Sequence, residues 1–399
     1  MGLIYCYTIY GVYLDKGEGG EIIHRMLTFH SIWTKPATLR GVEEMSLWDF
    51  EWLTWLAGIL EARNYGPVVL VADERGKTFV EKVGLAKFYD EIVLGLDHIP
   101  SFIDPEIFWA AGKLYAIRLL KKLKITSPSD GPVCSLDWDC IPWNYPKECA
   151  DIMCLNLEQL NWAWYKDCQS KYAEFAPNVN WELAPANNGV IHFKKYKDML
   201  VYGDFSTGFM ESFSAKASTK NYFNQPRYVY GDAMTFAEQQ LLSSAAHSIK
   251  KPVEPFLPVR DDGFLPRNAF FTHLWTTKTL YRAFPEARIH YTNQLIQYLR
   301  KAHPICIATL REQDLHITQP FLTSEENATW NKEGLKHFKS YNVAIVKELQ
   351  GSATLRDRNI PGARELRVGS IVLPGDRLTL QDNSSKIELE FNQATEYVN

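Results

Sequence analysis

The chain has 399 residues, and 46% of them are hydrophobic, which is enough to bury the core of one large domain and a smaller one. Its net charge of -4 and pI near 6.2 argue against a dominant role on nucleic acids or membrane surfaces, although local basic patches are compatible with both values. No apolar run approaches the roughly 18 residues of a membrane span, and residues 1–13 lack the basic start of a secretory signal. We therefore expect a soluble, cytoplasmic protein.

The seven cysteines, at positions 6, 134, 140, 149, 154, 168 and 306, include no C-x-x-C pair. An odd count fits poorly with a secreted disulfide framework, and the spacings match no zinc pattern. We interpret these cysteines as buried free thiols. The 12 tryptophans suit a protein that stacks on sugars or bases, and they suit a plain aromatic core equally well.

The first half of the chain predicts alternating strands and helices. Strands are expected at 3–13, 22–29, 67–72, 91–94 and 133–136, and helices at 47–64, 80–85 and 105–124. Alternation from residue 67 onward indicates an α/β sheet with mostly parallel order. Ligands of such sheets bind outside the carboxyl ends of the strands, where Asp73, Asp137 and Asp139 fall.

Asp137 and Asp139 carry the most specific chemical signal. They follow a short apolar strand with a spacing of i, i+2, so on a strand both carboxylates would point into one space. Two convergent carboxylates suit a hard divalent cation, which can neutralise a phosphate or diphosphate leaving group. The competing interpretation is a solvated strand end, because short acidic triplets are common.

The second half of the chain is mixed. Helices are expected at 155–172, 235–246 and 285–303, a turn at 185–189 leads into a strand through Phe193, and a Pro-, Asp- and Gly-rich loop spans 252–268. The last sixty residues predict a small all-β module with strands at 344–346, 351–355, 366–369, 371–378 and 386–391. We place a domain boundary near 335–340.

Seven short segments together resemble a GT-A-type glycosyltransferase of the bacterial capsular-sugar kind over about residues 1–300. They are HSIWTKP (30–36), VAD (71–73), FWAAGK (108–113), LDWD (136–139), NNGV (187–190), EQ (238–239), and HLW (273–275) with Lys278. The β module resembles the FecR-like type. The resemblance implies a GT-A-like (Rossmann-like) mixed sheet flanked by helices in a catalytic domain over 1–337. Its helical extension would span about 276–337, and a small all-β domain would span 338–399.

The resemblance also implies a nucleotide-sugar donor, with a UDP-sugar favoured, a hydroxyl-bearing acceptor, and Mn²⁺ or Mg²⁺ as cofactor. The implied metal ligands are Asp137, Asp139 and His273. The implied contacts to the nucleotide-sugar are Thr34, Lys35, Asp73, Lys113, Trp138 and Lys278. Glu238 would act as general base in an inverting enzyme, and Asn188 would lie near the donor or acceptor sugar.

Two departures from the family pattern leave other functions open. Trp138 stands inside the acidic triplet, and His192 with Phe193 follows the Asn-Gly turn where a Gly-Gly pair is common. This bulk narrows the donor pocket, or it marks a degenerate site in a recognition protein whose β module binds a protein or glycan. An Asp-x-Asp phosphohydrolase is a further alternative. Each of these residues also has an interpretation without function. His273 would be a core histidine, Lys113 a solvated surface lysine, and Glu238 an acidic residue favoured near a helix N-terminus.

Overall fold

The fold is that of a computed structural model, which describes residues 26–123, 131–146, 149–162, 165–219, 231–257, 271–274, 277–304, 344–356, 363–372, 376–382, 384–391 and 395–398. Several predictions lie outside these ranges: the strand at 3–13, Cys6, Cys306, Trp275, most of the 252–268 loop and the domain boundary near 335–340. The domain limits therefore stay predictions.

A mixed sheet forms the centre of the described α/β part. Its seven strands lie in the order β3-β2-β1-β4-β7-β6-β8. They are β1 (Leu27–Ile32), β2 (Val68–Ala72), β3 (Glu91–Leu94), β4 (Val133–Leu136), β6 (Ile152–Cys154), β7 (Val190–Phe193) and β8 (Glu254–Pro255). Strands β1 to β4 are parallel to one another, whereas β7 is antiparallel to both β4 and β6. The α/β class with flanking helices is confirmed, and the mostly parallel order holds for the first half.

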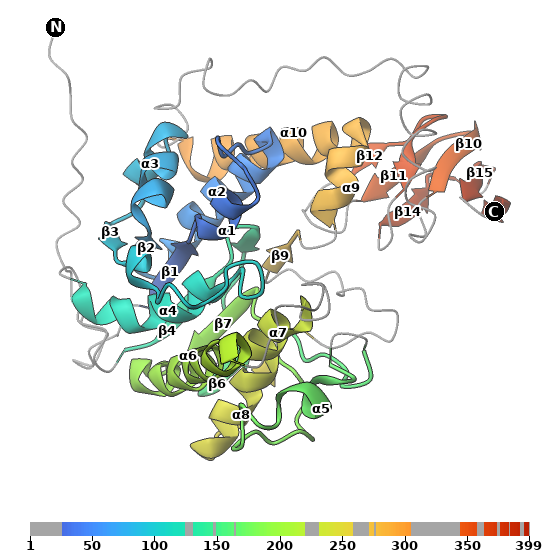
Figure 1. Ribbon diagram of the computed structural model, residues 1–399. Helices are drawn as coiled ribbons and strands as arrows, with labels where there is room; N and C mark the ends of the chain where they lie inside the picture. The colour runs from blue at the N-terminus through green and yellow to red at the C-terminus, as the bar shows by residue number, and fades with distance from the viewer. Residues whose placement is uncertain are drawn as a thin grey trace, which may run out of the picture.

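Helices cover both faces of this sheet (Figure 1). They are α1 (Lys35–Leu39), α2 (Asp49–Ala62), α3 (Glu74–Lys82), α4 (Ala111–Leu119), α5 (Cys168–Tyr172), α6 (Tyr196–Thr219), α7 (Gly231–Thr235), α8 (Leu241–Ser248), α9 (Thr277–Ala283) and α10 (Pro285–Ala302). A π-helical turn, Phe236–Gln240, joins α7 to α8. In β2, Val69 and Val71 pack into the core on the side of α4 and α6, whereas Leu70 packs on the side of α2 and α10. This two-sided burial explains the continuous apolar run of β2.

Two predicted helices begin later or earlier than expected for local reasons. Helix α3 starts at Glu74 and not at residue 80, because the Asp73 carboxylate caps it by accepting from the Gly76 amide at 2.7 Å. Helix α4 starts at Ala111 and not at residue 105. There the Asp104 side chain accepts from the Glu106 amide at 2.8 Å, an Asx-type contact that competes with the first helical turn.

The prediction of a helix over 155–172 is wrong for most of its length. Only Cys168–Tyr172 is helical in the described part of this segment. The amide of Leu155 donates to the Asn187 carbonyl at 3.1 Å, and the amide of Glu158 donates to the Pro185 carbonyl at 2.8 Å. These long-range backbone bonds pair residues 155–158 with residues 185–187, so tertiary pairing overrides the local apolar pattern there.

The long helix α6 was not predicted. It contains Gly203 and Gly208 together with Ser, Thr and aromatic residues, all of which favour a helix weakly. Packing supplies the stability instead, because a side chain at Gly203 would lie 3.1 Å from Ile117 of α4. Among the described helices, none combines the length and apolar composition that crossing a membrane requires.

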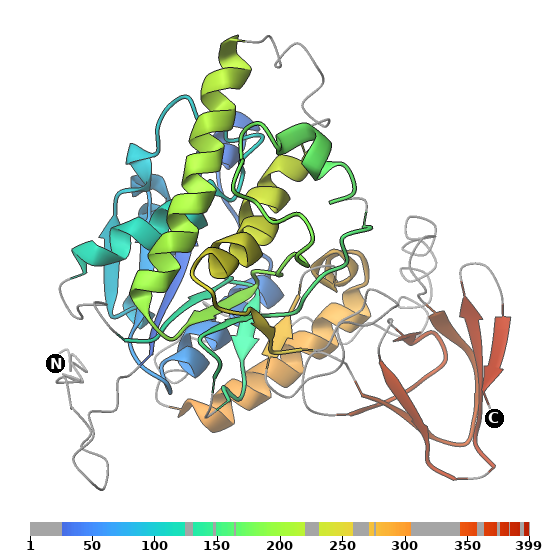
Figure 2. The same cartoon turned by 90° about the horizontal axis from the view of Figure 1, so that it is seen from below.

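The C-terminal strands form separate antiparallel sheets beside α9 and α10 (Figures 1 and 2). They are β10 (Ala344–Gln350), β11 (Ala353–Arg356), β12 (Arg364–Glu365), β13 (Ile371–Val372), β14 (Arg377–Leu380), β15 (Lys386–Phe391) and β16 (Thr395–Val398). The small all-β region is thus confirmed. The strand expected at 366–369 is wrong, because this segment turns through a bond from the Ser370 amide to the Arg367 carbonyl, and β16 was not predicted.

Candidate active site

The Asp-x-Asp segment is a tight turn between two strands. Strand β4 ends at Leu136, and β5 (Cys140–Pro142) begins one residue after Asp139. The Cys140 amide donates to the Asp137 carbonyl at 2.9 Å, which closes the turn. We expected both aspartates on a strand with parallel side chains. In the turn, each carboxylate instead meets its own set of partners.

Asp137 belongs to a cluster with Lys113 of α4 and Glu238 of the π-helical turn. The Lys113 ammonium lies 2.6 Å from the Asp137 carboxylate and 2.5 Å from that of Glu238, and it also donates to the Asn188 carbonyl at 3.1 Å. Burial disfavours the charged lysine, but the two carboxylates outweigh it and raise the pKa of Lys113. Burial raises the pKa of Asp137 to about 6 against the opposing effect of Lys113.

Asp139 faces Lys278 of α9 and His273 of β9 (Phe271–His273). One Asp139 oxygen lies 2.9 Å from the Lys278 ammonium, and the other lies 3.6 Å from Nε2 of His273. Burial favours the neutral acid, but His273 and Lys278 prevail and lower the pKa of Asp139. Burial also lowers the pKa of His273 against the pull of Asp139. The imidazole is thus held neutral, which is the form that binds metals.

These two clusters line one pocket of about 350 Å³. The predicted site residues that line it are Lys113, Asp137, Trp138, Asp139, Asn188, Glu238, His273 and Lys278. Aromatic side chains form part of the wall, and two of them, Trp109 and Trp138, are 48% and 36% exposed. The fold therefore brings together residues that lie up to 165 positions apart in the sequence, between Lys113 and Lys278.

Three predicted nucleotide-sugar contacts do not line this pocket. Asp73 accepts from the Thr34 amide at 2.6 Å and from the Thr34 hydroxyl at 2.8 Å, and its other oxygen caps α3. Lys35 is exposed at the start of α1. Asp73 and Thr34 thus join the end of β1 to α3, and their role in nucleotide binding stays a prediction.

Asn188 is anchored at the pocket by its amide nitrogen. Nδ2 donates to the Tyr202 hydroxyl at 2.6 Å and to the Glu238 carbonyl at 2.7 Å. The side chain is 1% exposed, and its Oδ1 is a buried acceptor that finds no donor among the described residues. A buried acceptor without a donor is costly, so this oxygen suits a hydrogen bond from a ligand.

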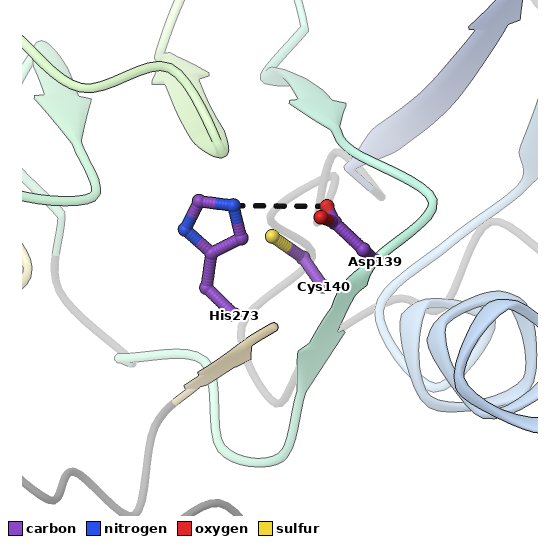
Figure 3. Close-up of side chains that lie close together, drawn as sticks. All are labelled: Asp139, Cys140 and His273. Atoms are coloured by element: carbon purple, nitrogen blue, oxygen red, sulfur yellow. Dashed lines mark ion pairs between the residues drawn. The ribbon is translucent and has the colours of Figure 1, made fainter. Parts of the chain in front are cut away.

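Cys140 lies beside the site although it was not predicted as a site residue. Strands β5 and β9 form a two-stranded ribbon in which Cys140 lies directly opposite His273. Within the described ranges, Asp139, Cys140 and His273 form the group whose potential ligand atoms lie within 4.8 Å of one another, and Asp137 is not a member (Figure 3). The spacing of cysteines alone could not reveal this group, because its histidine is distant in sequence.

Glycines shape the walls behind these residues. A Cβ at Gly189 would lie 2.9 Å from the His273 ring, and one at Gly58 of α2 would lie 2.5 Å from the Cys140 carbonyl oxygen. Both approaches are closer than a real side chain allows, so the glycines let β7 and α2 approach the ribbon. Gly189 appeared in the sequence analysis only as part of a turn.

Comparison with known proteins adds little about function. No protein-family model matches the sequence, and no curated protein matches it either. The solved structures that align include the galactosyltransferase LgtC in complex with donor and acceptor sugar analogues, over 58% of this chain and 73% of that one, at 11% identity and a TM-score of 0.28. The inositol-1-phosphate CTP transferase from T. maritima aligns over 58% of this chain and 84% of its own, at 12% identity and a TM-score of 0.28. Both are named transferases, but neither likeness is strong enough to indicate a function for this chain.

Proposed function

We propose that the protein is a metal-dependent glycosyltransferase that moves a sugar from a nucleotide-sugar donor to a hydroxyl acceptor. The observation that carries this proposal is the convergence of Asp139, His273 and Lys278 in one pocket. An anionic oxygen and a neutral imidazole can hold a divalent cation, and an ammonium group stands beside them. A cation bound there would neutralise the charge that develops on a departing diphosphate.

Lys278 is the lysine best placed to contact the diphosphate. Its side chain is 33% exposed, whereas that of Lys113 is 10% exposed and lies between two carboxylates. A flexible ammonium that keeps access to the pocket can follow the leaving group as its charge grows. Lys113 instead positions Asp137 and Glu238 relative to each other.

Other residues of the pocket suit the sugars. Oδ1 of Asn188, which has no donor among the described residues, can accept a hydrogen bond from a sugar hydroxyl, and the exposed ring of Trp138 offers a face on which a sugar can stack. Glu238 lies 5% exposed in the pocket, and it would take the proton of the acceptor hydroxyl in an inverting reaction. A pocket of about 350 Å³ lies at the small end of ligand sites, so the sugar and diphosphate would fill it while the base lies at its mouth.

Calorimetry with UDP-, GDP-, CMP- and dTDP-sugars, each with and without added divalent metal, tests the proposal. We expect one nucleotide class, with a UDP-sugar favoured, to bind in a metal-dependent manner. Asp139→Asn should weaken this binding at least about tenfold, in the range seen for altered metal surroundings. Asp204→Asn on the exposed surface of α6, at 63% side-chain exposure, is the matched control.

Absence of binding by every nucleotide-sugar with every metal would overturn the proposal. In that case a screen for partners of the residues 338–399 would test the recognition alternative. Release of phosphate from a simple phosphoester, lost in Asp137→Asn, would favour the phosphohydrolase alternative.

A further inference from the structure

We propose that Asp139 and His273 of this pocket form a cation site together with the buried Cys140, and that the site takes a thiophilic divalent ion such as Zn²⁺ in preference to Mg²⁺. The inference deepens the proposed function by naming the class of metal, and it rests on that function only for what the ion does in catalysis. In Figure 3 the three side chains point toward one space from the turn, from β5 and from β9.

The backbone fixes two of these ligands relative to each other. Cys140 and His273 are directly opposite in the antiparallel β5–β9 ribbon, and opposed residues of such a pair project to the same face with their Cβ atoms about 5 Å apart. The Leu274 amide donates to the Asp139 carbonyl at 3.0 Å and extends this pairing to the third ligand. The site is thus built on paired backbone, which gives a metal site its precision.

The distance between His273 and Asp139 suits two ligands of one tetrahedral ion. The 3.6 Å between Nε2 of His273 and Oδ1 of Asp139 is too long for a hydrogen bond. Ligands bound at about 2.1 Å to a tetrahedral zinc are separated by roughly 3.4 Å. The second oxygen of Asp139 is held by Lys278 at 2.9 Å, which is the kind of outer contact that orients a carboxylate ligand.

Among the described residues, the ion-pair partner of the His273 imidazole is Asp139, at a distance too long for a hydrogen bond. The His273 side chain is 6% exposed, and its Nδ1 is buried without a hydrogen-bond partner in the described part of the chain. Leaving a buried polar atom unpaired costs about 1 to 3 kcal/mol. Because Gly189 has no side chain, the His273 ring can lie against the start of β7; a Cβ at Gly189 would lie 2.9 Å from the ring. A metal ion would bind Nε2, the nitrogen that faces Asp139, and would hold the ring in this place, but it would not pair Nδ1.

The donor set and the charge select the ion. A thiolate disfavours Mg²⁺ and favours softer ions, while sulfur, nitrogen and oxygen donors together suit zinc. On binding, the S–H bond of Cys140 breaks, the sulfur bonds to the metal, and the proton passes to solvent. The charged side chains that the structure describes around the pocket are three carboxylates and two ammonium groups, so a dication with one thiolate makes the cluster neutral. Three protein ligands leave one position of a tetrahedral ion for a further ligand.

The test uses the full chain, first stripped of metal with a chelator and then titrated with Zn²⁺, Mn²⁺ and Mg²⁺ by calorimetry. We expect one Zn²⁺ to bind more tightly than either of the other ions. Cys140→Ser should weaken Zn²⁺ binding about 10- to 100-fold. Cys134→Ser, a buried thiol of the adjoining strand β4, is the matched control and should leave Zn²⁺ binding unchanged.

Substitution of Co²⁺ gives a readout that needs no variant. Sulfur ligation predicts an intense sulfur-to-cobalt charge-transfer absorption in the near ultraviolet in the wild-type protein. Lack of this absorption overturns the inference, and so does Zn²⁺ binding that is equal in wild type and in folded Cys140→Ser. Binding of Mn²⁺ or Mg²⁺ in place of Zn²⁺ also overturns it while leaving the proposed function intact. Zinc held by Cys140 without binding of any nucleotide-sugar upholds the inference and rejects the proposed function.

Discussion

Two sides of one pocket use the same residue types in different ways. On the first side, Asp137 and Glu238 enclose the buried ammonium of Lys113. On the second side, Asp139 meets the partly exposed Lys278 and His273, whose Nε2 lies 3.6 Å from Asp139, too far for a hydrogen bond. On the first side the charged groups neutralise one another, whereas on the second side His273 and Asp139 leave room for an ion between them.

This difference shows why an Asp-x-Asp pattern does not reveal the role of each carboxylate. The two residues are separated by one position, yet the turn sends Asp137 toward α4 and Asp139 toward β9 and α9. A buried carboxylate with a charged partner stabilises the fold, while a carboxylate with an unfilled coordination position can bind an ion. The predictions below test this division of roles.

Replacement of Lys113 by methionine should have the largest effect on stability. It would leave Asp137 and Glu238 facing each other without the ammonium between them, which costs about 3 kcal/mol for buried groups. Urea denaturation measures the loss. Lys278→Met, at 33% side-chain exposure, is the matched control and should cost less than about 1 kcal/mol. Equal losses in the two variants would contradict the division into a Lys113 side that stabilises the fold and a Lys278 side that binds a ligand.

The free energy of unfolding should fall at acid pH partly because of a histidine in the sheet, and not only because of the charged residues of the pocket. Burial, followed by Lys194, lowers the pKa of His192 on β7 to about 4. The unfolded chain takes up this proton below its pKa of about 6.5, but the folded chain does so only near pH 4, so folding loses stability as the pH falls between these values. At about pH 4.5, this difference in the pKa of His192 lowers the free energy of unfolding by about 2 kcal/mol.

His192→Leu removes this titration and should reduce the loss of unfolding free energy between pH 7 and about pH 4.5 by about 2 kcal/mol. His247→Gln, at an exposed position in α8, should leave the slope unchanged. An unchanged slope in His192→Leu would show that other groups cause the acid sensitivity, among them His30 and His290, whose pKa values burial lowers to about 3.

Helix α2 should fix the position of β5, and with it the site of Asp139, Cys140 and His273, through close contact. A Cβ at Gly58 would lie 2.5 Å from the Cys140 carbonyl oxygen, so Gly58→Ala must displace the ribbon. We expect a loss of about 1 to 2 kcal/mol together with weaker Zn²⁺ binding. Gly208→Ala in α6, where a Cβ meets no atom within 4 Å, should gain about 0.5 to 1 kcal/mol and leave metal binding unchanged. Unaltered metal binding in Gly58→Ala would show that β5 does not fix the site.

Parts of the fold with strong local patterns were predicted well. The apolar run of β2, the largely buried helix α2 and the strand β3 lie at or within one or two residues of their expected places. The helix expected at 155–172 failed because partners far along the chain decided its conformation, and α6 was missed because its stability comes from packing. The FecR-like character of the C-terminal strands stays a prediction.

The sequence alone determined that acidic residues follow a buried strand, because burial leaves a clear apolar pattern before the polar strand end. It also assembled, through the resemblance, most of the residues that line the pocket. Only the tertiary structure decided which residues meet. The turn separated the two aspartates, Lys113 arrived from α4, and the β5–β9 pairing set Cys140 opposite His273. Contacts of this kind depend on strand register and helix position, which no local pattern of residues encodes.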